Sequence, residues 1–338
     1  RDRTDFGICP TPMLQFYVPR LGAAGAVAVS GGHHAAGWNA LMLIGADGGP
    51  LDPMVGEQVL DAYHAGVFAD RDAFGIGTCR AFAGDHEVYW TALAQAVDAE
   101  GIRARRFRVI ADPAGGAGCP YLETWAQRFG VELIRVNGDP SPFPARDPEP
   151  RPRTARSIAS LVHPLGAAVG FVLSSDMGRL SLVTERGEPL SEEWTFALIA
   201  DHLLRRRSGP IVANCCTTRA VDELAAHYGA PLIKTPVGQA PVVAAVRDEA
   251  ALLGGEGSGS VVVPAFSLGY DGFLMMTLIL EYLAQTRATL SERLAALPRY
   301  AIVKRSVPCE PGQSYRAIER LRDRLERCLL YTSDAADD

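Results

Sequence analysis

The stretch Phe107-Arg-Val-Ile-Ala-Asp-Pro-Ala-Gly-Gly-Ala-Gly118 decides the fold of this chain. It opens with a short apolar run that predicts a buried strand over residues 107–111, and the Asp-Pro pair and glycines after it predict a turn. Apolar residues then recur at helical spacing over residues 122–129, and residues 131–136 again have the pattern of a strand. A strand, a helix and a strand in this order are typical of parallel α/β layers.

The same order of elements returns further along the chain. Residues 211–214 and 231–234 predict strands, and residues 220–228 predict the helix between them. The segment Pro140-Ser-Pro-Phe-Pro-Ala-Arg-Asp-Pro-Glu-Pro-Arg-Pro152 cannot be regular helix or sheet interior. It is either a linker or an ordered extended crossover. We therefore expect a mixed α/β protein of more than one domain, at ~100–150 residues per domain.

Composition excludes several classes of protein. The chain has 338 residues, of which 48% are hydrophobic and 21% charged, and its net charge is −6. This balance gives no basic surface for nucleic acid, and no apolar run approaches the ~20 residues of a membrane-spanning helix. The seven cysteines are odd in number and form no Cys-x-x-Cys pair, which favours free thiols in a reducing cytoplasm. The adjacent Cys215 and Cys216 are expected to be small buried residues.

Four loops carry residues suited to chemistry. Val29-Ser-Gly-Gly-His-His-Ala-Ala-Gly-Trp-Asn39 combines glycines, a hydroxyl and imidazoles, which suit either an anion site or a plain flexible turn. Ser174-Ser-Asp-Met-Gly-Arg179 follows an apolar strand and is either a ligand loop or a turn between strands. Gly254-Gly-Glu-Gly-Ser-Gly-Ser260 is either a sugar-binding loop or a flexible connector. Thr235-Pro-Val-Gly-Gln239 alone indicates only a turn.

Taken in order, these loops resemble those of the α-D-phosphohexomutase superfamily, which includes phosphoglucomutase, phosphomannomutase and phosphoglucosamine mutase. The resemblance covers roughly residues 5–327 and is carried by five motifs. They are Cys9-Pro-Thr-Pro-Met13, Val109-Ile-Ala-Asp-Pro-Ala-Gly-Gly-Ala-Gly118, Phe143-Pro-Ala-Arg-Asp-Pro-Glu-Pro150, Gly255-Glu-Gly-Ser-Gly-Ser260 and Tyr270-Asp-Gly272. The resemblance implies that the proline-rich segment is an ordered crossover.

The resemblance also implies a domain organisation. Three mixed α/β domains around a cleft are expected at residues 1–83, 84–190 and 191–297, with the start of a fourth domain at 298–327. Residues 328–338 lack helical periodicity and resemble the translation of a sequencing adapter, so we expect them to be foreign to the fold. On this view the chain is a fragment truncated at both ends.

Members of the family pass a phosphoryl group between a phosphoserine and a hexose phosphate, with magnesium held by three aspartates. The resemblance places the phosphoserine slot at Gly32, which has no nucleophile, and the histidine after it at His33. Ser30 is a candidate substitute nucleophile. It lies two residues early, which displaces its hydroxyl by ~6–7 Å if the backbone is extended.

The other two loops keep only part of the family pattern. Of the three metal-binding carboxylates only Asp176 remains, because Ser174 and Gly178 occupy the other two slots. The resemblance assigns substrate binding to Arg179, Glu256 and Ser258. Magnesium prefers several carboxylate ligands, so weak or absent magnesium binding is expected at this loop.

Two functions from different classes follow. The first is a hexose-phosphate mutase that interconverts hexose 1-phosphate and 6-phosphate, with a hexose 1,6-bisphosphate as activator. The alternative is a non-catalytic pseudoenzyme that binds a sugar phosphate. The mutase needs a new phosphoryl acceptor, whereas the binding protein needs only Glu256, Ser258 and Arg179. We expect the fragment itself to be inactive, and Gly32, His33, Asp176, Arg179, Glu256 and Ser258 to line one cleft.

Overall fold

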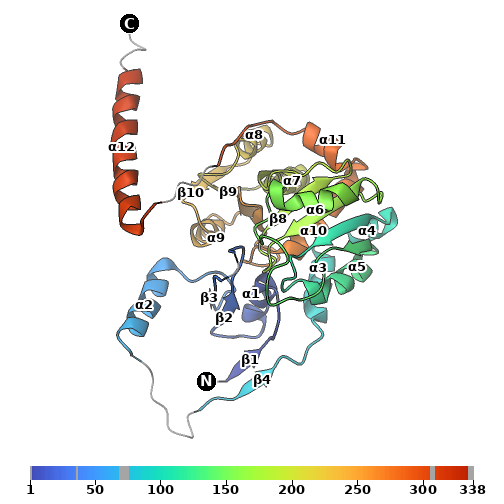
Figure 1. Cartoon of the computed structure of the whole chain (residues 1–338), viewed down its shortest axis with the longest axis horizontal. Helices are drawn as coiled ribbons and strands as arrows, with labels where there is room; N and C mark the ends of the chain where they lie inside the picture. Colours follow the sequence, from blue (N-terminus) through green and yellow to red (C-terminus); the bar gives the residue numbers. More distant parts are fainter. Residues whose placement is uncertain (1, 36, 68–75, 305–308, 334–338) are drawn as a thin grey trace. The chain divides into compact units, whose positions relative to one another are not determined.

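Two compact units make up the chain, Arg1–Tyr300 and Ala301–Asp338. The computed structural model describes residues 2–35, 37–67, 76–304 and 309–333. In these residues, the first unit holds two four-stranded sheets and two strand pairs, with helices packed on them (Figure 1). The mixed α/β class predicted from the sequence is confirmed.

The first four-stranded sheet, the β5–β8 sheet, has the strand order β6-β5-β7-β8. The two neighbours of β5 run parallel to it, and β8 returns antiparallel to β7. The bounds are β5 (Arg108–Asp112), β6 (Glu132–Arg135), β7 (Val169–Leu173) and β8 (Leu180–Thr184). The strand–helix–strand pattern of the opening stretch therefore builds the parallel part of this sheet.

Helices cover both faces of the β5–β8 sheet because its strands are apolar on both sides. Trp125 and Phe129 of α5 (Leu122–Phe129) belong to the same core cluster as Val109 and Phe171. The opposite face of the sheet packs on α6 (Pro152–Val162). Ile110 of β5 belongs to the same core cluster as Ile158 of this helix. The other elements here are α3 (Glu87–Gln95), α4 (Ala99–Arg105) and η1 (Cys119–Tyr121).

The second four-stranded sheet, the β9–β12 sheet, repeats this plan with the order β10-β9-β11-β12. Strand β9 runs parallel to both of its neighbours, β10 and β11, and β11 and β12 form an antiparallel hairpin. Its strands are β9 (Ile211–Asn214), β10 (Leu232–Thr235), β11 (Leu253–Glu256) and β12 (Ser260–Val262). Its helices are α7 (Glu193–Arg206), α8 (Ala220–His227), α9 (Gln239–Asp248) and α11 (Leu290–Ala295).

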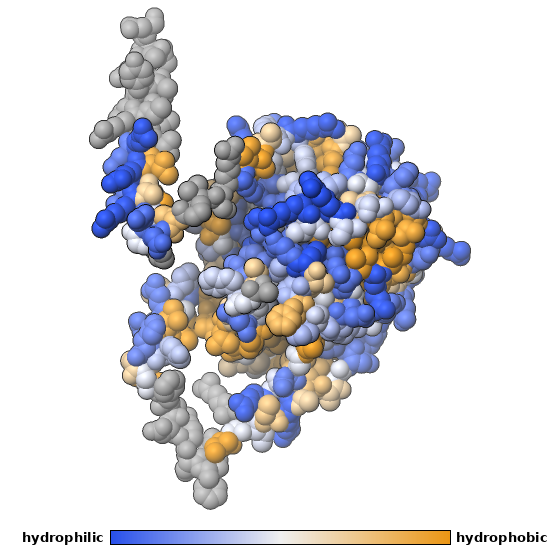
Figure 2. All heavy atoms as spheres, viewed as in Figure 1, coloured by the Kyte–Doolittle hydropathy of each residue, from blue (hydrophilic) through white to orange (hydrophobic). Residues whose placement is uncertain are grey.

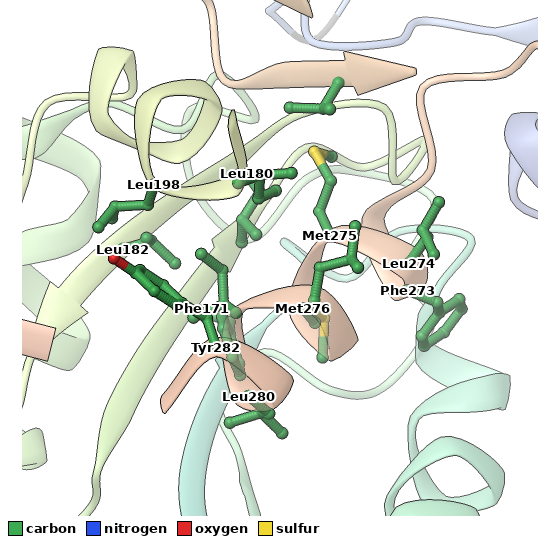
Figure 3. Close-up of a cluster of buried hydrophobic side chains, with 14 of the residues drawn as sticks. Phe171, Leu180, Leu182, Leu198, Phe273, Leu274, Met275, Met276, Leu280 and Tyr282 are labelled. Atoms are coloured by element: carbon green, nitrogen blue, oxygen red, sulfur yellow. The ribbon is translucent and has the colours of Figure 1, made fainter. Parts of the chain in front are cut away.

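Helix α10 (Gly272–Thr286) joins the cores of the two sheets. It is apolar on almost every side, as expected of a helix that is buried all round. Figure 3 shows its Met276, Leu280 and Tyr282 beside Phe171 of β7 and Leu182 of β8. Polar contacts add to this packing, because the Trp125 indole donates to the Thr277 hydroxyl at 2.9 Å. The two sheets therefore share one continuous core.

The N-terminal region is less buried. Strands β2 (Gly25–Ser30) and β3 (Ala40–Gly45) form an antiparallel pair, and β1 (Arg3–Asp5) pairs with β4 (Cys79–Ala81) in parallel. Helix α1 (Thr11–Arg20) packs on one face of β2 and β3. Every residue of α2 (Pro53–His64) is exposed or half-buried, and Figure 2 shows hydrophobic atoms at the surface in its region.

The second unit contains α12 (Pro311–Ser333). This helix continues to Ser333, although the sequence shows no helical periodicity after residue 327, since Leu329 and Leu330 are good helix formers and extend an existing helix at low cost. Residues 334–338 lie outside the described residues. Within the described parts of the chain, every helix is too short or too polar to cross a lipid bilayer.

Candidate active site

The turn at residues 30–34 directly follows β2. The Gly32 amide donates to the Ser30 hydroxyl oxygen at 2.9 Å, and the His34 amide donates to the Gly31 carbonyl at 3.0 Å. Gly32 has a φ of +58°, which side chains other than glycine rarely adopt. The chain therefore bends sharply instead of staying extended. The displacement of ~6–7 Å given for Ser30 applies only to an extended backbone, which the chain does not have at this turn.

The turn at residues 174–179 connects β7 to β8 and is closed by its own side chains. The buried Ser174 hydroxyl donates to Asp176 Oδ1 at 2.6 Å and accepts from the amides of Gly178 (3.1 Å) and Arg179 (2.9 Å). The Gly178 amide also donates to Asp176 Oδ1 at 3.0 Å. Ser174, which occupies one of the expected metal-ligand slots, thus provides hydrogen-bond partners for the remaining carboxylate, Asp176, and for the nearby backbone amides.

These two turns lie against each other. The Ser175 hydroxyl donates to the Gly32 carbonyl at 2.5 Å. A Cβ placed on Gly32 would lie 3.5 Å from Asp176 Oδ2. The structure therefore brings the expected phosphoserine slot next to the expected metal carboxylate, although they are more than 140 residues apart in sequence.

His33 is half-buried beside charged groups of the 174–179 turn. Burial, followed by the positive charge of Arg179, lowers the pKa of His33 from 6.5 to about 4. The imidazole is therefore neutral at pH 7. Arg179 itself donates from Nη1 to Glu149 Oε1 at 3.0 Å, and Arg151 contacts the other oxygen of Glu149 at 2.5 Å. The proline-rich segment thus supplies the counter-ion of Arg179.

The turn at residues 256–260 connects β11 to β12. Its buried Glu256 accepts two hydrogen bonds at Oε1, from Asn214 Nδ2 at 2.7 Å and from the Gly238 amide at 3.0 Å. Asn214 ends β9, and Gly238 follows β10. One carboxylate therefore joins the loops at the carboxyl ends of three parallel strands, where ligands bind in open α/β sheets.

The 256–260 turn also packs on the 174–179 turn. The Ser260 hydroxyl donates to the Gly178 carbonyl at 3.1 Å, and the Leu180 amide donates to the Gly259 carbonyl at 2.9 Å. A Cβ on Gly259 would lie 2.3 Å from the Leu180 carbonyl, so the approach requires glycine. Ser258 is half-buried, and its hydroxyl donates to Ser260 Oγ at 3.3 Å.

The expected site residues therefore form a connected group. Gly32, His33, Asp176 and Arg179 are neighbours around the 174–179 turn, and Glu256 and Ser258 belong to the turn packed on it. The buried Tyr270 lies near Glu256 and Arg179; burial, then the charge of Glu256, raises the pKa of its hydroxyl well above its usual range. Whether all six line one ligand cleft stays a prediction.

A cavity of about 380 Å³ lies next to this group. It is bordered by the first turn, the glycine turn after β5 and the proline-rich segment. Its lining includes Gly31, His34, Trp38, Gly115, Phe143 and Ser175.

Sequence reasoning missed two buried polar contacts that shape the site. Arg146 of the proline-rich segment pairs with the fully buried Asp112 at 2.9 Å and donates to the Leu173 carbonyl at 2.8 Å. It thereby fixes the crossover to the ends of β5 and β7. Asp271 accepts from the Tyr89 hydroxyl and caps α10 through the Leu274 amide. The sequence carries a signal for each contact. Arg146 is a charged residue among prolines, and Asp271 directly precedes a helix.

The donor set does not fit a magnesium ion. Magnesium takes hard oxygen ligands, usually including carboxylates, in near-octahedral geometry. In the 174–179 turn the only carboxylate is Asp176, and one of its oxygens already accepts a hydroxyl and an amide. Within the described residues, no three His, Cys, Asp or Glu side chains converge as a metal site would require.

Cys215 and Cys216 differ from the sequence-based expectation. Both side chains are exposed, and their sulfur atoms lie 4.0 Å apart. They follow the last residue of β9, where the chain leaves the sheet for the surface. The expectation that they are small buried residues is therefore wrong.

Comparison with known proteins identifies the class to which this fold and these turns belong. Three models of phosphoglucomutase/phosphomannomutase alpha/beta/alpha domains match the chain: domain I over residues 1–70, domain II over 87–187 and domain III over 191–300. The chain belongs to the α-D-phosphohexomutase superfamily, as the sequence motifs predicted.

Individual relatives give the same assignment. A phosphoglucomutase/phosphomannomutase of Thermococcus kodakarensis is 31% identical over 301 residues, which cover 88% of this chain and 66% of the relative. The chain therefore spans about two thirds of that curated relative.

Solved structures share the fold. A phosphoglucomutase/phosphomannomutase family protein of Burkholderia thailandensis has a TM-score of 0.78 at 23% identity, covering 89% of this chain and 66% of that one. An Aspergillus fumigatus N-acetylphosphoglucosamine mutase, solved with GlcNAc-6P and magnesium, has a TM-score of 0.60 at 14% identity and covers 86% and 77%.

Proposed function

We propose that this protein binds a hexose phosphate at the three turns around residues 32, 176 and 256, and that it does not transfer a phosphoryl group through residue 32. The hexose phosphate follows from the family, whose N-acetylphosphoglucosamine mutase member was solved with GlcNAc-6P. We infer the absence of phosphoryl transfer from the residues that form the turns around positions 32 and 176.

One observation carries the proposal. The Ser174 hydroxyl closes the 174–179 turn on Asp176, so this turn is complete without a cation. Gly32, which faces Asp176, has no atom that could accept a phosphoryl group. Loss of the acceptor removes the need for metal ligands around it, because the metal stabilises charge on the group being transferred. The two changes are therefore consistent with each other.

The retained groups suit binding. Glu256 is fixed at the ends of three strands by Asn214 and Gly238, and its carboxylate lies beside the buried Tyr270, so it is a positioned acceptor for a sugar hydroxyl. Arg179 is the nearby cation for a phosphate and is already paired with Glu149. An incoming phosphate must compete with that carboxylate, so affinity depends on the balance of charge at Glu149.

A second candidate function is phosphoryl transfer through Ser30. It is favoured by the 2.9 Å contact between the Ser30 hydroxyl and the Gly32 amide, since the hydroxyl lies beside the residue that occupies the expected slot. In this step the Ser30 oxygen bonds to phosphorus while the bond from phosphorus to the sugar oxygen breaks. The serine proton passes to the neutral ring of His33, and the leaving oxygen takes a proton from solvent.

Mass spectrometry and calorimetry separate the two functions. The 338-residue chain is incubated with glucose 1,6-bisphosphate, and protein-bound phosphate is located by peptide mapping. Binding without transfer predicts no phosphorylated peptide, together with glucose 6-phosphate binding that Glu256→Gln weakens at least tenfold. The exposed Glu57→Gln serves as the matched control.

Phosphate on Ser30 that disappears in Ser30→Ala but remains in Ser160→Ala would establish transfer instead. No binding of either sugar phosphate to the wild-type chain would contradict both functions.

A further inference from the structure

Cys215 and Cys216 form a pair of exposed thiols beside the loop that holds Glu256. We propose that this pair is a reversible redox site: a peroxide or a small-molecule disulfide oxidises it to a disulfide between the two neighbours, and this releases the contact between Asn214 and Glu256. The thiol chemistry stands on its own geometry. Its effect on ligand binding rests on the function proposed above.

The pair differs from the other cysteines whose side chains the structure describes. Cys9 is half-buried and Cys119 is buried, and burial raises the pKa of their thiols to about 12 and about 11. Cys79 and Cys309 are exposed, at separate points of the chain. Thiolate formation and access to solvent control cysteine oxidation, and a second thiol within reach converts it into a disulfide. Positions 215 and 216 combine exposure with a neighbouring sulfur at 4.0 Å.

A short chain of hydrogen bonds connects the pair to Glu256. The Cys216 amide donates to Asn214 Oδ1 at 3.1 Å, and the Thr217 hydroxyl donates to the same oxygen at 2.8 Å. The Nδ2 group of the Asn214 side chain donates to Glu256 Oε1 at 2.7 Å. The Gly257 amide in turn donates to the Thr217 hydroxyl at 3.1 Å. The orientation of Asn214 therefore depends on the backbone of Cys216.

Oxidation must move that backbone. A disulfide usually joins Cα atoms about 4.4–6.8 Å apart, whereas consecutive residues lie about 3.8 Å apart, so closing the bond between these neighbours distorts the backbone that joins them. The Cys215 amide is fixed by the Thr235 carbonyl at 2.9 Å, at the end of the β9–β10 ladder. The movement therefore falls on Cys216, whose amide leaves Asn214. Asn214 then loses one of the two donors that orient its side-chain amide toward Glu256.

The reaction balances with either oxidant. With hydrogen peroxide, the two thiols lose two electrons and two protons as the sulfur–sulfur bond forms, the oxygen–oxygen bond breaks, and two waters result. With a small disulfide, one thiolate attacks a sulfur atom to give a mixed disulfide and one free thiol. The neighbouring thiolate then displaces the second thiol. A dithiol reductant reverses both routes.

The test treats the full chain with hydrogen peroxide or glutathione disulfide and maps the peptide that contains positions 215 and 216. The expected product has lost two hydrogens within this peptide and returns to the starting mass with dithiothreitol. Phenylarsine oxide, which bridges two close thiols with loss of water, should label the same peptide and block its oxidation. Cys215→Ser and Cys216→Ser should each abolish both products, whereas Cys79→Ser should keep them. Mixed disulfides alone, with no internal product, would overturn the proposal.

Hydrogen exchange tests the coupling without a ligand. Oxidation should speed exchange of the Gly238 and Gly257 amides on the order of tenfold, because both report on the Asn214–Glu256 connection. The amides of the 174–179 turn should stay unchanged. Equal exchange at Gly238 and Gly257 in the two redox states would overturn the coupling. If the exchange changes but the reduced chain fails to bind glucose 6-phosphate, the redox site stands and the proposed function is wrong.

Discussion

The turns at residues 174–179 and 256–260 occupy the same place in two sheets of the same plan. Each joins the last two strands of a four-stranded sheet, in the orders β6-β5-β7-β8 and β10-β9-β11-β12. Asp176 in the first turn is satisfied within its own loop, by Ser174 and Gly178. Glu256 in the second is satisfied by residues of two other loops, Asn214 and Gly238.

This difference separates a closed turn from a shared one. A carboxylate that pairs inside its own loop has fewer free positions for a ligand, and its loss affects that loop alone. A carboxylate that joins three loops fixes the geometry of a whole edge of the sheet. The comparison therefore predicts that Glu256 contacts the ligand directly, whereas Asp176 only supports the turn that carries Arg179.

The largest expected effect is that of Glu256→Ala. It leaves the buried Asn214 amide and the Gly238 N–H without an acceptor, and unsatisfied buried groups cost about 1–3 kcal/mol each. We expect the free energy of unfolding to fall by about 2–4 kcal/mol in urea denaturation. Glu256→Gln keeps an acceptor oxygen and should lose less than half as much. Equal losses in both variants would show that charge, and not the shared acceptor, holds the three loops.

Asp271 offers a third carboxylate, next to the residue that contacts the 174–179 turn. The Gly272 amide beside it donates to the Met177 carbonyl at 2.8 Å. Burial raises the pKa of Asp271 from 3.8 to about 6. The folded protein therefore binds more protons than the unfolded chain between these values, and the free energy of unfolding falls as pH rises through this window.

The Asp271→Asn variant cannot titrate but keeps the capping oxygen. This variant should reduce the decrease in the free energy of unfolding between pH 4 and pH 7 by roughly 2–3 kcal/mol. Urea denaturation at pH 4, 5, 6 and 7 measures it. An unchanged pH profile would mean that Asp271 titrates normally.

Asp176→Ala should have a smaller effect than Glu256→Ala. The Ser174 hydroxyl loses its acceptor but still accepts two backbone amides, so the loss should be about 1–2 kcal/mol. Amide exchange should rise in the 174–179 turn and stay unchanged at Gly238. Faster exchange at Gly238 would break the distinction between a closed and a shared turn.

His33 should contribute a pH dependence of opposite sign to that of Asp271. Its pKa of about 4 lies below the 6.5 of the unfolded chain, so the unfolded state binds more protons between these values. Stability should fall by on the order of 1 kcal/mol as pH drops from 6.5 to 4, after allowance for solvent screening. His33→Gln should remove this fall, whereas the exposed His227→Gln should keep it. A retained fall in His33→Gln would place the titrating group elsewhere.

The smallest expected effect is that of magnesium. With one carboxylate in the turn, millimolar magnesium chloride should leave the melting temperature of the chain unchanged within about 1 °C. A magnesium-dependent rise that disappears in Asp176→Asn but not in the control Asp248→Asn would show a metal site despite the closed turn.

The sequence predicted the layers better than the contacts at the site. Periodicity located the strand–helix–strand units because burial of apolar side chains sets that pattern directly. The loop motifs identified which turns to compare. The closure of Ser174 on Asp176 depends on side-chain orientation, and sequence spacing does not encode it.

Two expectations assumed simple local geometry. The ~6–7 Å displacement of Ser30 applied only to an extended strand. A left-handed Gly32 bends the chain instead. Cys215 and Cys216 were expected to be buried because small cysteines often are. They follow a strand of four residues that ends at the sheet edge, so the chain leaves the core before them.

Calorimetric titration of the reduced 338-residue chain with glucose 6-phosphate tests the central claim most directly. It compares the wild type with Glu256→Gln, Asp176→Asn and the control Glu57→Gln. We expect at least tenfold weaker binding in Glu256→Gln, about 1.4 kcal/mol or more. A change within twofold is expected in Asp176→Asn and in the control. Binding that is lost in Asp176→Asn and retained in Glu256→Gln would contradict the account.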